Sequence, residues 1–157
     1  MDFQDFINRY EEQLHKLFNV EDDIDTLSLD RGISNYLFDE IMSCNPLSVF
    51  IPEEYGGRGG KTHEALAMLE TSSYVSLPLS LMMGINGALF LQPLDNYAEE
   101  ETKSKIFHRF TEENIMGGLM ITEPDFGSDA LHMETSYTYN DRVGKYRVQG
   151  SKHWAGL

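Results

Sequence analysis

The stretch at residues 78–91, PLSLMMGINGALFL, is apolar on almost every side of a helix. A helix without a polar face needs apolar neighbours all round it, so this stretch predicts a helix buried inside a bundle. Gly84 and Gly87 would let those neighbours approach closely. The run is shorter than the roughly 18 consecutive apolar residues that a membrane-spanning helix requires, so we expect no membrane insertion.

Four other segments have apolar residues at helical spacing and can supply those neighbours. We expect the second to end before Pro46, because proline disfavours helical geometry in the residue that precedes it. The third begins at Thr62, which can cap it. Between these two lies a glycine-rich stretch, residues 56–60, which predicts a tight, exposed loop. The four helical segments are residues 3–18, about 30–43, 62–73 and 99–110.

The pattern changes from helical spacing to alternation after Asn114. Residues 115–121 form a compact apolar run that favours a strand over a helix. Residues 135–139 and 146–149 alternate in the manner of strands, and the turn-forming residues 140–144 separate them. The two alternating segments therefore predict a β-hairpin.

Helices followed by strands indicate an α+β fold with two domains in series. We expect an N-terminal helical bundle over residues 1–113 and the incomplete beginning of an antiparallel β domain over residues 114–157. The charge is distributed unevenly along the chain: residues 1–30 hold nine acidic and two basic side chains, whereas residues 121–157 hold five acidic and four basic ones. The two predicted domains thus have different surfaces.

Charge and composition argue against several classes of function. A net charge of −14 repels phosphate backbones and anionic membrane surfaces, so we expect no nucleic-acid partner. A single cysteine, Cys44, cannot form an internal disulfide, which suggests a reducing, cytoplasmic location. The five histidines stand without a second ligand at suitable spacing, so we assign no metal site. Gly60-Lys61-Thr62 ends like a phosphate-binding loop, but Tyr55 stands where that loop needs a glycine.

The segment at residues 121–129, ITEPDFGSD, carries the most chemical information. A strand ends at Pro124, the chain turns, and Gly127 would permit a conformation closed to other residues. Backbone N–H groups and the Ser128 hydroxyl would then face outwards. Such a turn can hold a polar cofactor or a phosphate oxygen without a cationic side chain. A β-turn with no ligand is the alternative interpretation of the same residues.

Three motifs follow one another along the chain: VFIPEEYGGRGG at residues 49–60, TEPDFGSD at 122–129 and GSKHW at 150–154. In this order they resemble the acyl-CoA dehydrogenase family, and the resemblance covers the chain from about residue 30. It implies an N-terminal helical domain, a middle β domain and a C-terminal helical domain in a homo-oligomer, a dimer or tetramer. FAD would lie between the last two domains and a neighbouring subunit.

The resemblance also implies a reaction. A carboxylate base removes the α-proton of an acyl-CoA thioester while the β-hydrogen leaves as hydride to the flavin, and the electrons pass to an electron-transferring flavoprotein or another acceptor. This is oxidoreductase chemistry of fatty acid metabolism. The family's catalytic base would lie beyond Leu157, so we assign no catalytic residue and expect the 157-residue chain alone to be inactive.

The same resemblance assigns contacts to individual residues. Met120, Ile121 and Thr122 would line the flavin, with backbone N–H groups and the Thr122 hydroxyl near its pyrimidine ring. Reduction places negative charge there, which fixed N–H dipoles stabilise. Trp154 would pack on the flavin face, and Gly156 would offer a backbone N–H.

The substrate side of the site would involve Ser128, which would contact polar atoms of the cofactor or the thioester ligand, and Gly127, which would allow the close approach. Two positions depart from the family pattern: Leu119 replaces a frequent aromatic residue, and Gly156 replaces a hydroxyl side chain. These departures leave room for a flavin-dependent oxygenase or oxidase on the same scaffold. A short, non-enzymatic chain that binds a partner through its incomplete β domain is a third hypothesis.

Overall fold

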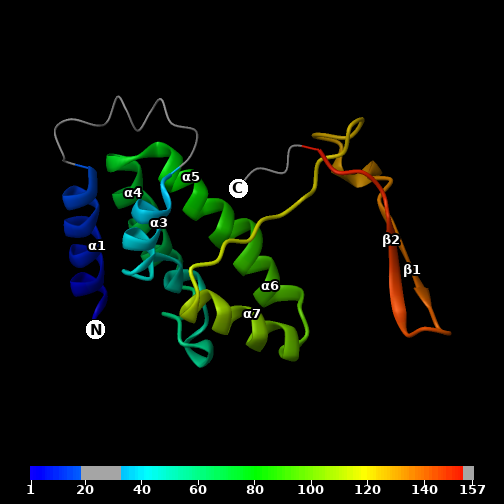
Figure 1. Cartoon of the computed structure of the whole chain (residues 1–157), viewed down its shortest axis with the longest axis horizontal. Coiled ribbons are helices and arrows are strands. Elements are labelled where there is room, and N and C mark those ends of the chain that lie inside the picture. The colour runs from blue at the N-terminus through cyan, green and yellow to red at the C-terminus, as the bar shows by residue number, and fades with distance from the viewer. Residues whose placement is uncertain (19–32, 154–157) are drawn as a thin grey trace. The chain divides into compact units, whose positions relative to one another are not determined.

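The computed structural model describes residues 1–18 and 33–153. The chain divides into two compact units, Met1–Gly117 and Gly118–Leu157. The first unit is helical, and the described part of the second contains a two-stranded antiparallel sheet (Figure 1). The predicted α+β fold, with helices first and an antiparallel β region after them, is confirmed.

The helices of the first unit correspond to most of the predicted segments, with corrected ends. Residues 30–32 of the second predicted segment lie outside the described residues; in its described part the helix begins at Asn35, because the Ser34 side chain accepts a hydrogen bond from the Leu37 N–H and caps the helix there. Thr62 is the first residue of its helix and not its cap; Lys61 holds the cap position. The helices are α1 (Phe3–Phe18), α3 (Asn35–Met42), α4 (Thr62–Val75), α5 (Leu77–Asn86), α6 (Gln92–Tyr97) and α7 (Glu100–Glu112).

The core of the first unit lies where α1 packs against α3 and α4, and where α4 packs against α5. It includes one polar pair: the Tyr10 and Ser72 hydroxyls lie 2.9 Å apart and are both buried. Burial raises the pKa of Tyr10 to about 12, so its hydroxyl stays protonated. The fully buried apolar side chains are those of Tyr10, Leu14, Ile41, Leu47, Val49, Ile51, Met68, Leu79, Met83, Leu91 and Phe107.

The apolar stretch forms part of one continuous helix, Leu77–Tyr97, in which α5 and α6 are joined by a π-helical turn, η3 (Gly87–Leu91). This helix has 21 residues, and an 18-residue window within it reaches a mean hydropathy of 1.3. By length and composition alone it could cross a membrane, but core helices of soluble proteins meet the same criterion. The expected burial on every side is wrong, because Leu81 and Leu89, within the predicted stretch, are exposed. The expected close approach is present at Gly87, where a Cβ would overlap the Phe50 ring.

The glycine-rich loop connects two 3₁₀ turns, η1 (Pro46–Phe50) and η2 (Glu53–Tyr55), to α4. The short apolar run before the loop is therefore a 3₁₀ turn. Gly56 and Gly59 have φ values of +84° and +97°, which L side chains rarely adopt. At Gly57 a Cβ would overlap the backbone oxygen of Ile51. These glycines allow the loop to fold back onto η1.

The second unit contains the predicted hairpin, β1 (Ser136–Asn140) paired with β2 (Lys145–Gln149). Tyr139 faces Tyr146 in the register, and Gly144 has a φ of +61° in the connecting turn. Residues 115–121 form no strand, although their composition favoured one. Their backbone is not hydrogen-bonded to a neighbouring strand among the described residues, so apolar composition alone was insufficient.

Candidate functional site

The second unit brings the second and third motifs side by side. The His153 N–H donates to the backbone oxygen of Thr122 at 2.8 Å. The neighbouring Lys152 ammonium donates to the backbone oxygen of Ile121 and to Glu123 Oε1, both at 2.9 Å. Lys152 and His153 of the third motif thus contact residues 121–123, at the start of the second motif.

Glu123 is the buried carboxylate of this site, with 5% of its surface exposed. Its oxygens accept hydrogen bonds from the backbone N–H groups of Glu134 at 2.7 Å and Thr135 at 2.9 Å, in addition to Lys152. The neighbouring Thr135 side chain, the Lys152 ammonium and these N–H groups lower the pKa of Glu123 to about 2. Glu123 is therefore a carboxylate at any ordinary pH.

Gly150 permits this packing. A Cβ at Gly150 would overlap Thr135 Oγ1 and would lie 2.7 Å from the Thr135 Cα. The first residue of the third motif is therefore a glycine because the segment before β1 passes directly against it.

The turn predicted after Thr122 is present. Glu123 and Phe126 exchange backbone hydrogen bonds, at 3.0 Å from the Glu123 N–H and 3.2 Å from the Phe126 N–H. Gly127 differs from the expectation: its φ lies outside the positive range and a Cβ there would meet nothing within 4 Å. Its backbone therefore does not require glycine. Gly127 and Ser128 are both exposed.

The predicted flavin-lining residues offer hydrogen-bond donors. Met120 and Ile121 are exposed, and among the described residues no acceptor meets the backbone N–H groups of Met120, Ile121 or Thr122. N–H groups with an adjacent hydroxyl match the carbonyl-rich and nitrogen-rich edge of a flavin ring, so these residues fit FAD. Trp154 and Gly156 lie outside the described residues.

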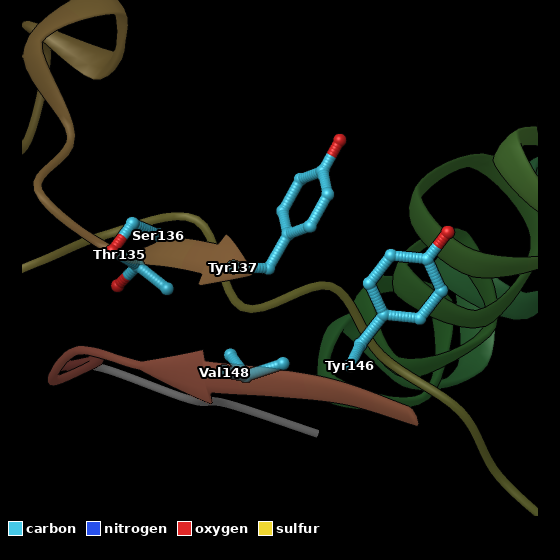
Figure 2. A pocket seen from close by; sticks show the side chains of 5 residues that line it. All are labelled: Thr135, Ser136, Tyr137, Tyr146 and Val148. Atoms are coloured by element: carbon cyan, nitrogen blue, oxygen red, sulfur yellow. The ribbon is translucent and has the colours of Figure 1, made fainter. Parts of the chain in front are cut away.

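Two cavities of the second unit border this region. One, of about 340 Å³, is lined by the turn and by residues near the ends of the hairpin strands. Its lining places the carboxylates of Asp125 and Glu134 beside the turn with no Lys or Arg side chain to offset them, and this negative charge opposes the phosphate that the sequence allowed there. The other, of about 380 Å³, lies on the exposed aromatic face of the hairpin, where Tyr137 and Tyr146 stand beside Val148 (Figure 2).

The first motif has a structural role in the helical unit. Arg58 donates from Nε to Glu64 Oε2 at 2.6 Å, and its guanidinium lies 4.8 Å from the centre of the Phe6 ring. The Tyr55 hydroxyl donates to Glu100 Oε2 at 2.7 Å, which connects the loop to α7. The hydrogen bond to Glu100 raises the pKa of Tyr55. Both contacts hold the glycine-rich loop against helices.

Glu123 and Lys152 had no functional role in the sequence-based prediction. Both lie within the recognised motifs, so their position was a usable signal. Their pairing could not be read from the sequence, because it depends on how the segment after β2 returns to the segment before Pro124.

Comparison with known proteins agrees with the resemblance that the three motifs carry. The family model "Acyl-CoA dehydrogenase, N-terminal domain" matches residues 18–114. A glutaryl-CoA dehydrogenase from Desulfococcus multivorans is 34% identical over 108 residues, which are 66% of this chain and 27% of that protein. The chain thus spans about a quarter of the length of the curated relatives it matches.

Solved structures share the fold. Butyryl-CoA dehydrogenase from Megasphaera elsdenii matches with a TM-score of 0.75 and 24% identity, over 94% of this chain and 40% of that one. An acyl-CoA dehydrogenase from Bacillus anthracis, complexed with FAD, matches with a TM-score of 0.73 and 23% identity, over 97% of this chain and 26% of that one.

Proposed function

The chain belongs to the acyl-CoA dehydrogenase family, and from this membership we propose that it forms the N-terminal part of an FAD-dependent enzyme that oxidises acyl-CoA thioesters at the α,β bond. The observation that carries the proposal is the contact between the second and third motifs. Lys152 and His153 hold Ile121 and Thr122 while the neighbouring N–H groups meet no protein acceptor among the described residues.

The residues of this chain would bind and orient the cofactor. When bound, FAD would take up the hydride from the β carbon of the thioester. The N–H groups of Met120, Ile121 and Thr122, with the Thr122 hydroxyl, would stabilise the negative charge that then develops on the ring edge. Ser128 and Gly127, exposed on the turn, would contact the cofactor or the thioester ligand.

We assign the base of the reaction to no residue of this chain. Glu123 is the carboxylate closest in sequence to the proposed flavin contact, but a pKa of about 2 makes it a weak proton acceptor. Its oxygens are also engaged by Glu134, Thr135 and Lys152. We therefore propose that the 157-residue chain does not turn over acyl-CoA by itself.

The electron acceptor and the assembly follow from the family resemblance: the acceptor would be an electron-transferring flavoprotein or a comparable carrier, and the assembly a homo-oligomer. The proposed cytoplasmic location rests instead on the single cysteine, Cys44. The enzyme would serve fatty acid metabolism.

The test is a titration of the isotope-labelled chain with FAD, followed by NMR. We expect the amide signals of Met120, Ile121 and Thr122 to shift, together with those of Gly127 and Ser128. Shifts confined to other residues, or none at millimolar FAD, would refute the flavin contact. In a parallel assay with acyl-CoA and a dye acceptor, measurable oxidation by the chain would refute the claim that it lacks the base.

A further inference from the structure

We infer that Lys152 is a positioning residue, which sets the direction of the Thr122 N–H toward its ligand; this rests on the flavin contact proposed above. The Lys152 side chain is only 20% exposed, and its ammonium has three partners. It donates to the Ile121 backbone oxygen and to Glu123 Oε1 at 2.9 Å each, and it lies 3.2 Å from Met133 Sδ. A surface lysine that only carried charge would not be engaged on three sides.

The carbonyl that Lys152 contacts belongs to the same peptide group as the Thr122 N–H. A trans peptide is planar, so its oxygen and its hydrogen point in opposite directions, and the chain contains no cis peptide among its described residues. Because the ammonium holds the Ile121 oxygen, the Thr122 N–H must point away from Lys152. This N–H is one of the donors without a protein acceptor among the described residues.

The next peptide group is held in the same manner. His153 donates to the Thr122 oxygen at 2.8 Å, and the N–H of that peptide, on Glu123, donates to the Phe126 oxygen at 3.0 Å. The carbonyl and the N–H of this second peptide group therefore both have hydrogen-bond partners within the unit. In the first peptide group only the Ile121 carbonyl has a hydrogen-bond partner among the described residues, which leaves the Thr122 N–H for a ligand.

Loss of the Lys152 ammonium would remove the hydrogen bond to the Ile121–Thr122 peptide group and leave the other hydrogen bonds of the site in place. Glu123 would still accept hydrogen bonds from the N–H groups of Glu134 and Thr135. The peptide between Ile121 and Thr122 would lose its only described partner and could rotate. A positioning role therefore predicts a local change at Thr122 with the hairpin unaltered.

The experiment compares Lys152→Met with Lys145→Met in the labelled 157-residue chain. Lys145 is an exposed lysine in the same unit, so its variant has the same charge change. In Lys152→Met we expect the NMR order parameter of the Thr122 N–H to fall from about 0.85 to below about 0.6, with Glu134 and Thr135 unchanged. We expect FAD to bind about tenfold more weakly, because the donor is no longer preorganised. Lys145→Met should leave both quantities as in the unaltered chain.

The outcomes separate this inference from the proposed function. An unchanged Thr122 order parameter in Lys152→Met, or equal loss of FAD binding in Lys145→Met, would overturn the positioning role. Absence of any FAD-induced shift in the unaltered chain would refute the flavin contact, while the order parameter still reports on Lys152. If Lys152→Met also disorders the hairpin, the Thr122 order parameter is measured in Lys152→Arg instead. This variant keeps the charge and the donors, so a Thr122 amide that is mobile in a folded Lys152→Arg chain overturns the inference.

Discussion

Replacement of Arg58 by methionine should destabilise the helical unit strongly. The guanidinium donates to Glu64 Oε2 at 2.6 Å, and Glu64 is 4% exposed, so the variant leaves a buried carboxylate without its main partner. Removal of one member of a buried ion pair costs about 3–5 kcal/mol. Lys61 Nζ, 3.8 Å from Glu64 Oε1, offsets part of that cost, whereas the lost contacts with the Phe3 and Phe6 rings add to it. We expect a loss of about 3 kcal/mol and a Tm lower by about 10 °C.

Urea denaturation of the 157-residue chain, monitored by circular dichroism, measures this loss. The matched control is Arg109→Met, because Arg109 pairs with Glu113 at 2.9 Å while both side chains are about half exposed. That variant should cost less than about 0.5 kcal/mol. The double variant R58M/E64M should recover most of the stability, since it also removes the buried charge. If Arg58→Met costs no more than Arg109→Met, the ion pair does not stabilise the fold and the reasoning is wrong.

Three further predictions test other parts of the structure. Gly87→Ala should destabilise the chain by about 1–3 kcal/mol, because its Cβ overlaps the Phe50 ring, whereas Gly84→Ala, whose Cβ meets only a Leu69 methyl at 3.7 Å, should be neutral or stabilising in the same urea titration. Glu123 has a folded pKa of about 2, below its unfolded value near 4.5, so its stabilising contribution is complete above that value and is lost as the pH falls toward 2. Hairpin NMR signals followed from pH 6 to pH 2 should show this loss, and Glu123→Gln should abolish that pH dependence. Gly127→Ala should leave stability unchanged, so weaker FAD or acyl-CoA binding by this variant would report a ligand contact, and unchanged binding would remove Gly127 from the site.

Local patterns predicted the elements whose geometry is local. The spacing of apolar residues predicted α1, and alternation around a turn predicted the β1–β2 hairpin. The sequence did not reveal η1, because a short apolar run is compatible with a strand and with a buried helical turn. Nor did it reveal the exposed side of α5, because composition does not determine which faces find a neighbour.

The sequence predicted which motifs form the site, but not which residues of those motifs contact one another. Thr122 and the turn after it were recognised from residue types, and the turn is present in the structure. The expected backbone role of Gly127 was wrong, because glycine at a turn is compatible with a conformation that other residues also adopt. The roles of Glu123 and Lys152 depend on a pairing between segments on either side of the hairpin, which periodicity cannot report.

Arg58 and Lys152 each hold a buried glutamate, yet their replacement should change different quantities. Besides Glu64, the Arg58 guanidinium lies over two aromatic rings of α1, so its contacts join elements of the core and its loss lowers the free energy of unfolding. Besides Glu123, Lys152 contacts a backbone carbonyl whose peptide carries an N–H without a protein acceptor among the described residues. Its loss should therefore change the direction of one donor before it changes stability. The partners left to each carboxylate also differ: Glu123 keeps the N–H groups of Glu134 and Thr135, whereas Glu64 keeps only Lys61 Nζ, at 3.8 Å, among its described partners. Loss of Arg58 therefore leaves a buried charge poorly compensated, and loss of Lys152 does not.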